Sequence, residues 1–139
     1  MSDDSQRTAT VLVADSDEDE LFLLKSVLAL KGFDVLRASD GQEVVDLATR
    51  WRPDLILTEL KLPVISGFTV IRRIKKLASL RDIPIIAVSL DRPVSHRKLA
   101  LAAGCAAYLD KPVDFDQLGA LIDQFLPGYQ WQLTSALVH

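Results

Sequence analysis

Several features are scarce or missing in this sequence of 139 residues, and each of them excludes a class of protein. The single cysteine, Cys105, excludes an internal disulfide framework and a zinc site made of cysteines. No apolar run reaches the length of about 18 residues that a membrane-spanning helix needs. The first residues, Met1-Ser2-Asp3-Asp4, are acidic where a signal peptide would be basic and then apolar. We therefore expect a protein of the reducing cytoplasm with no membrane partner.

An excess of positive charge is also absent. The chain has 16 lysines and arginines against 19 aspartates and glutamates, and this net charge of −3 argues against a nucleic-acid partner. Basic residues are nevertheless frequent between residues 66 and 98. We interpret them as solvated helix faces, with a docking patch as the alternative.

What the sequence does have is the size and composition of one globular domain. Hydrophobic residues make up 49% of the chain and charged residues 25%, which are ordinary proportions for a protein with a buried core. We assign residues 9–126 to this domain, residues 1–8 to a flexible N-terminus and residues 127–139 to a short C-terminal tail. Because the tail is too short to fold as an output domain, we expect a stand-alone module.

Short apolar runs alternate along the chain with segments of helical periodicity. This alternation predicts an α/β fold in which helices cover both faces of a doubly wound, five-stranded parallel sheet. The predicted strands are 11–14, 33–38, 55–58, 85–88 and 106–109. The predicted helices are about 17–31, 40–51 and 68–77, a fourth that ends at Gly104, and a fifth over 114–125.

Polar residues follow four of the predicted strands, and in an open parallel sheet the carboxyl ends of the strands carry the functional site. They are Asp15-Ser16-Asp17 after the first strand, Glu59 after the third, Ser89 after the fourth and Asp110-Lys111-Pro112 after the fifth. Carboxylates bind divalent metal ions, and hydroxyl and ammonium groups bind phosphoryl oxygens. The set predicts a site that handles a phosphoryl group.

At these residues the sequence resembles the receiver domain of two-component response regulators, over about residues 9–126. The segments that carry the resemblance are Val11 to Asp15, Pro53 to Pro63, Ser66-Gly67, Pro84 to Ser89, Ala103-Gly104-Cys105 and Tyr108 to Pro112. The resemblance implies a flavodoxin-like (βα)5 fold with strand order 2-1-3-4-5. It also implies a signalling module that is not an enzyme, with a histidine kinase or a downstream effector as partner.

Compared with this family, the sequence keeps some site residues and changes others. Asp15 matches one of two adjacent acids and Lys111 matches the conserved lysine, whereas Ser16 replaces the second acid. Glu59 stands where the family has the phosphate-accepting aspartate. The resemblance implies switch roles for Ser89 and Tyr108, and the bulky Leu90 follows Ser89 where a small residue is usual. Asp15, Asp17 and Glu59 remain as candidate ligands, so we expect weak Mg²⁺ binding or none.

These changes argue against ordinary phosphorylation. The Glu59 side chain is one methylene longer than aspartate, and misplacement of a reacting group by roughly 1 Å can cost 10²-fold in rate. A longer carboxylate can instead reach Lys111 and permanently supply the negative charge of a phosphoryl group. We therefore interpret the chain as a degenerate receiver, or pseudo-receiver. It would act through its fourth helix, fifth strand and fifth helix, with Arg92, Arg97, Lys98 and Tyr108 facing an acidic partner or a second copy of the chain.

Three other interpretations of the same residues stay open. The first is a functional phosphoacceptor that takes phosphate from a histidine kinase with Mg²⁺. The second is that Glu59 is only a strand-end acid neutralised by Lys111, with no signalling role. The third, a binder of small molecules, has little support because no glycine-rich phosphate loop follows the first strand.

Overall fold

The computed structural model describes residues 8–90 and 94–129. Within these residues five strands alternate with five helices, as the sequence predicts. The strands are β1 (Thr10–Ala14), β2 (Asp34–Ala38), β3 (Leu55–Glu59), β4 (Ile85–Ser89) and β5 (Ala107–Asp110), and the helices are α1 (Glu18–Leu30), α2 (Gly41–Trp51), α3 (Gly67–Lys76), α4 (Val94–Ala103) and α5 (Phe115–Phe125). Strands β3 and β4 each extend one residue beyond their predicted ends, so that Glu59 and Ser89 belong to the strands. Most of the predicted terminal segments, and Arg92, lie outside the described residues.

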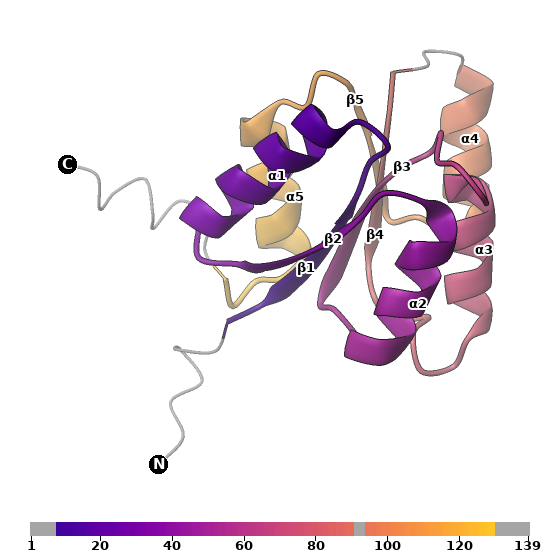
Figure 1. Cartoon of the computed structure of the whole chain (residues 1–139), viewed down its shortest axis with the longest axis horizontal. Coiled ribbons are helices and arrows are strands. Elements are labelled where there is room, and N and C mark those ends of the chain that lie inside the picture. Colours follow the sequence, from indigo (N-terminus) through magenta and orange to yellow (C-terminus); the bar gives the residue numbers. More distant parts are fainter. Residues whose placement is uncertain (1–7, 91–93, 130–139) are drawn as a thin grey trace.

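The strands form one parallel sheet in the order β2-β1-β3-β4-β5, which confirms the predicted doubly wound architecture. Helices α1 and α5 cover one face of the sheet, and α2, α3 and α4 cover the other (Figure 1). Every residue of β3 and β4 is buried, as expected for strands covered on both faces. Strand β2 lies at the edge of the sheet, where Asp34 and Arg37 are exposed.

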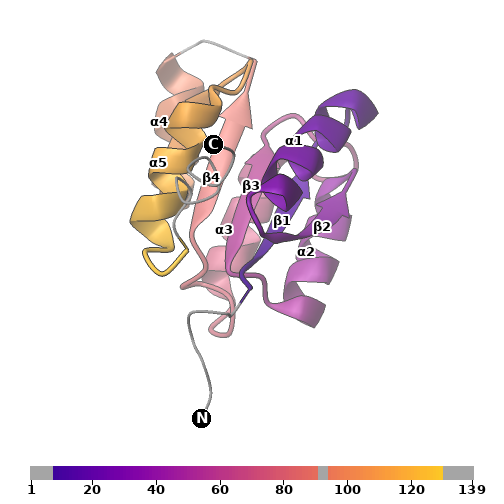
Figure 2. The ribbon, with the colours of Figure 1, turned by 90° about the vertical axis from the view of Figure 1, so that its left-hand side faces the viewer.

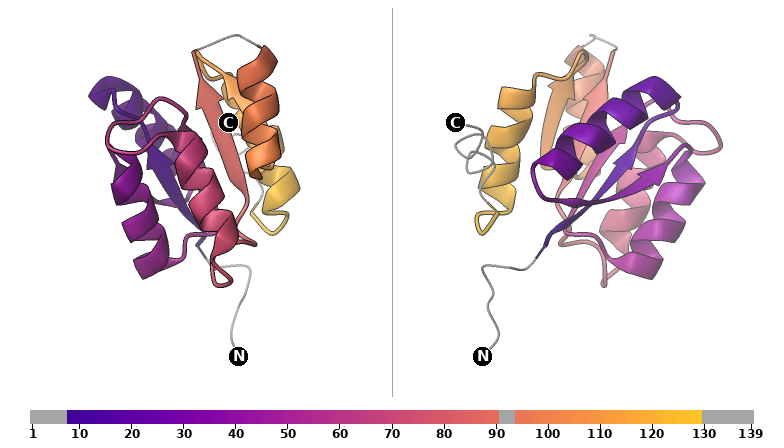
Figure 3. Two further views of the ribbon diagram at one scale, coloured as in Figure 1. Left: turned by 90° about the vertical axis from the view of Figure 1, so that its right-hand side faces the viewer. Right: turned by 60° about the vertical axis from the view of Figure 1, so that its left-hand side comes forward.

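The apolar residues form two cores, one on each face of the sheet. Leu24 and Leu28 of α1 pack with Leu118 and Ile122 of α5 in the first core, on the side of the sheet seen in Figure 2. The second core lies under the helices seen in the left panel of Figure 3 and contains side chains of α2, α3 and α4, among them Val44, Ile71 and Ala100. None of the helices in the described residues combines the length and the apolar character that a membrane crossing requires.

Short loops connect the carboxyl ends of the strands to helices that begin with side-chain caps. Asp17 caps α1, Asp40 caps α2 and Ser66 caps α3, each by accepting hydrogen bonds from backbone N–H groups of the first turn. At the start of α3 a Cβ atom on Gly67 would lie 2.4 Å from the backbone oxygen of Glu59. Only glycine fits there without displacing the backbone, so Gly67 allows α3 to begin directly against the end of β3.

Candidate functional site

Three charged side chains from the ends of three strands meet at the carboxyl edge of the sheet. The Lys111 Nζ, just after β5, donates hydrogen bonds to Asp15 Oδ2 at 2.6 Å and to Glu59 Oε1 at 2.9 Å. Asp15 is only 1% exposed, Lys111 8% and Glu59 9%. The sequence analysis predicted that these strand ends would converge, and the structure brings all three residues into direct contact.

The remaining oxygens of the two carboxylates also accept hydrogen bonds. Asp15 Oδ1 accepts from the backbone N–H of Asp17 at 2.9 Å. Glu59 Oε2 accepts from the backbone N–H of Ser16 at 3.1 Å and from its hydroxyl at 3.0 Å. All four carboxylate oxygens therefore have donors from the protein itself, as buried charged groups require.

Burial is the largest influence on all three charged groups, and it disfavours the charged form of each. Burial, with repulsion from Glu59, raises the pKa of Asp15 despite its hydrogen bond from Lys111. Burial also acts to raise the pKa of Glu59, but the hydrogen bonds from Lys111 and Ser16 outweigh it and lower that pKa. Burial acts to lower the pKa of Lys111, and its hydrogen bonds to the two carboxylates raise it instead. At neutral pH the site therefore holds a charged lysine against an ionised Glu59.

The side chain of Asp17 is engaged at the start of α1. Its Oδ1 accepts hydrogen bonds from the backbone N–H groups of Asp19 at 2.9 Å and Glu20 at 3.3 Å. As a metal ligand Asp17 would have to give up part of this cap. Among the residues that the structure describes, no group of three or more acidic, histidine or cysteine side chains is arranged to hold a metal ion.

The two predicted switch residues are both buried. Ser89 is 2% exposed, and its backbone oxygen accepts a hydrogen bond from the backbone N–H of Lys111 at 2.9 Å. Tyr108 is 8% exposed and packs within the core under α2, α3 and α4. The guanidinium of Arg97, on α4, lies 5.6 Å from the centre of the Tyr108 ring. Tyr108 is therefore mostly covered, although it also lines a hollow between α4, β5 and α5, where the sequence predicts contact with a partner.

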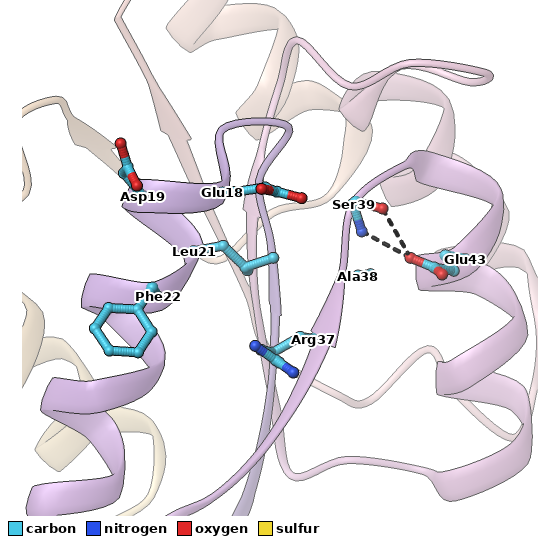
Figure 4. Close-up of a pocket in the computed structure, with 8 residues that line it drawn as sticks. All are labelled: Glu18, Asp19, Leu21, Phe22, Arg37, Ala38, Ser39 and Glu43. Atoms are coloured by element: carbon cyan, nitrogen blue, oxygen red, sulfur yellow. Dashed lines mark hydrogen bonds between the residues drawn. The ribbon is translucent and has the colours of Figure 1, made fainter.

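A separate hollow of about 600 Å³ lies at the same edge of the sheet, between the starts of α1 and α2 (Figure 4). Its lining residues are Glu18, Asp19, Leu21, Phe22, Arg37, Ala38, Ser39 and Glu43. None of the three charged residues of the site lines it. The sequence analysis did not single out this hollow.

Sequence reasoning missed the part that Ser16 plays in the site. It identified Ser16 only as the place of a missing acid, whereas the structure shows two hydrogen bonds from Ser16 to Glu59. The sequence held a signal for this role. Ser16 is a hydrogen-bond donor at the predicted place of an acid, and Glu59 is a longer acceptor side chain than the aspartate that the resemblance predicts. Two such changes at one site can compensate for each other.

Comparison with known proteins gives consistent results over nearly the whole chain. The profile of the response regulator receiver domain family matches residues 11–123. The chain is 32% identical, over 117 residues, to the polar-differentiation response regulator DivK of Brucella anthropi, which covers 84% of this chain and 95% of that protein. Its identity to the DivK protein of Brucella ovis is 31% over 119 residues, covering 86% and 97% of the two chains.

Solved structures show the same architecture. A putative response regulator from Chloroflexus aurantiacus superposes with a TM-score of 0.83 and 26% sequence identity, covering 87% of this chain and 99% of that one. The receiver domain of a sensor histidine kinase from Pseudomonas aeruginosa, described with a magnesium ion coordinated in its active-site cleft, has a TM-score of 0.81 and 27% identity. It covers the same shares of the two chains.

Proposed function

Because this chain belongs to the response regulator receiver domain family, we propose that it is a pseudo-receiver, in which Glu59 fills the phosphoacceptor position and permanently replaces the phosphoryl group. Receiver domains are signalling modules that interact with histidine kinases and effectors. In our proposal the chain performs no catalysis and acts by protein–protein contact alone.

The observation that carries this proposal is the hydrogen bond between Glu59 and Lys111. The Glu59 carboxylate reaches the Lys111 ammonium at 2.9 Å, which is the group that would bind a phosphoryl oxygen in a phosphorylated receiver. The pKa of Glu59 is lowered, so this negative charge persists at every physiological pH. A charge that is transient in an ordinary receiver is therefore a fixed part of this side chain.

The family also implies a magnesium ion, and the site residues in their present arrangement do not fit one. Mg²⁺ needs oxygen ligands in near-octahedral geometry, and carboxylates usually supply one or two of them. Here the oxygens of Asp15 and Glu59 already accept hydrogen bonds from Lys111, Ser16 and Asp17. A bound ion would have to displace the Lys111 ammonium or the Ser16 donors. We therefore derive no step that uses the metal.

The first prediction concerns this metal. Millimolar Mg²⁺ should raise the melting temperature of the wild type by less than about 1 °C, because a ligand stabilises a fold appreciably only when its concentration exceeds its dissociation constant. Differential scanning fluorimetry with Mg²⁺, and with Na⁺ at equal ionic strength, measures the effect. A larger rise that Asp15→Ala abolishes would show that the carboxylates do release their donors to an ion.

The proposed contact surface is the α4–β5–α5 face, which we define by Arg97, Lys98, Tyr108, Gln117 and Leu121. A hollow of about 400 Å³ is lined by all of these except Lys98. Arg97 and Lys98 are exposed and give this face two positive charges, against one negative charge from the exposed Asp110, which also lines the hollow. We propose an acidic surface of a kinase or effector as the partner, with a second copy of the chain as the alternative.

The second prediction tests whether the site and this face are linked. In Glu59→Gln the charge is lost and the volume is kept, so the pairing with Lys111 should weaken. Amide chemical shifts should then change along the α4–β5–α5 face, and the affinity for a partner captured on the wild type should fall by about 1–3 kcal/mol. Glu43→Gln is the matched control, because Glu43 also accepts hydrogen bonds from a serine but lies outside the charged cluster. Shift changes confined to the immediate neighbours of residue 59 would mean that the face is independent of the site.

A further inference from the structure

We propose that Ser16 is the positioning residue of the built-in carboxylate, so that Ser16 and Glu59 are a matched pair that closes the site. This inference rests on the proposed function. It assigns a role to Ser16, which the sequence analysis noted only as the replacement of an acid. Ser16 holds one carboxylate oxygen of Glu59, and Lys111 holds the other. With both oxygens fixed, the carboxylate has one orientation.

The geometry supports a specific role rather than a chance contact. Two donors of the same residue, its backbone N–H and its hydroxyl, converge on Glu59 Oε2 at 3.1 and 3.0 Å. Ser16 follows β1 and Glu59 ends β3, and these strands are neighbours in the sheet. A donor directly after β1 is therefore within reach of a side chain that is one methylene longer than aspartate.

An acid at position 16 would have the opposite effect on Glu59. An aspartate there would replace the hydroxyl that lies 3.0 Å from Glu59 Oε2 by a third negative charge, in addition to the nearby charge of Asp15. Like charges at that distance repel strongly in a partly buried site. Serine at position 16 and glutamate at position 59 therefore depend on each other.

The same molecule contains a control pair with the same local chemistry. Ser39 follows β2, and its backbone N–H and hydroxyl donate to Glu43 Oε1 at 2.7 and 3.3 Å (Figure 4). Both residues are exposed, and neither belongs to the cluster around Lys111. Ser39→Ala therefore removes the same type of hydrogen bond without touching the site.

The first arm of the test measures Glu59 itself. Carboxyl ¹³C shifts followed against pH should show that Ser16→Ala raises the proton affinity of Glu59 by up to about tenfold, because a hydrogen bond to a charged acceptor is lost. Ser39→Ala should leave the Glu59 titration unchanged. A Glu59 titration that is the same in Ser16→Ala and in the wild type overturns the proposal, even if Ser16→Ala lowers stability.

The second arm compares one substitution in two backgrounds. With Glu59 present, Ser16→Asp should shift the unfolding equilibrium toward the unfolded state by about tenfold or more. In the Glu59→Asp background the same substitution should cost much less, because the shorter side chain withdraws from position 16. If Ser16→Asp shifts the unfolding equilibrium equally in the two backgrounds, the pairing of Ser16 with Glu59 is overturned. If Ser16→Asp alone prevents folding while the double variant folds, the pairing is supported.

The two proposals fail in different ways. The proposed function fails if Glu59→Gln leaves partner affinity and the α4–β5–α5 face unchanged, whatever Ser16 does. The pairing of Ser16 with Glu59 fails on the titration and on the two-background comparison, neither of which involves a partner.

Discussion

A variant that carries both Ser16→Asp and Glu59→Asp should accept a phosphoryl group from acetyl phosphate in the presence of Mg²⁺, whereas the wild type should not. In the assignment that we propose for Ser16 and Glu59, the two changes restore the pair of adjacent acids and the shorter acceptor side chain of the family. Lys111 and Ser89 are still present and buried, and Lys111 lies in contact with residue 59. Because a misplacement of roughly 1 Å can cost 10²-fold, we expect the difference in rate to be at least that large.

Mass spectrometry of the intact protein measures the added phosphoryl group, and hydroxylamine sensitivity identifies it as an acyl phosphate. The wild type and the Lys111→Ala form of the double variant are the controls, and both should stay unmodified. Modification of the wild type at Glu59 would instead favour a functional phosphoacceptor. If the double variant stays unmodified as well, the acceptor position is blocked by something other than these two residues. Leu90 is a weak candidate for such a block, because it is 66% exposed.

The architecture and the meeting of three charged residues could be predicted from the sequence because both follow from simple rules. Apolar runs such as those that became β3 and β4 predict strands buried on both faces. Once the strands are parallel, their carboxyl ends share one edge, so Asp15, Glu59 and Lys111 must approach each other. Residue patterns are sufficient for this level of detail.

Individual hydrogen bonds could not be predicted in this way, because they depend on shifts of about an ångström that a pattern does not specify. Asp17 is predicted only as a candidate ligand for weakly bound or absent Mg²⁺, and the pattern does not specify that its side chain caps α1. Ser16 was counted as a lost charge, yet its backbone N–H and hydroxyl both donate to Glu59. Tyr108 is predicted at the contact surface; it packs within the core beside Arg97 and also lines the hollow of the α4–β5–α5 face. In each case the pattern places the residue in its strand or loop, and the contacts of its side chain come only from the structure.

Replacing Lys111 by methionine should be the most destabilising single change in the charged cluster. The substitution keeps much of the side-chain volume but leaves Asp15 and Glu59 buried without their shared cation. Removing one partner of a buried ion pair typically costs about 3–5 kcal/mol, a large part of the roughly 5–15 kcal/mol that stabilises a domain. Denaturant unfolding at neutral pH measures the loss. Adding Glu59→Gln to Lys111→Met should recover part of it, because one of the two uncompensated charges is then removed.

The loss of stability caused by Lys111→Met should also depend on pH, and the direction of this dependence follows from the pKa shifts. In the wild type the pKa of Glu59 is lowered, so its stabilisation is present above the unfolded value of about 4.3 and is lost as the pH falls through the lower folded value. The raised pKa of Asp15 acts with the opposite sign, and this contribution grows in the variant, where the hydrogen bond from Lys111 is lost. In the variant burial raises the pKa of both carboxyl groups, so the variant gains stability as the pH falls from about 7 to about 4. The difference between the two proteins should therefore shrink toward acid pH. Lys75→Met is the matched control. Lys75 Nζ donates at 2.9 Å to the backbone oxygens of Arg81 and Ile83, which do not titrate. The carboxylate of Asp82 acts on Lys75 only through space, so the cost of Lys75→Met should vary less with pH. A cost of Lys111→Met that is as flat with pH as that of Lys75→Met would show that the lysine stabilises the fold by packing rather than by its charge.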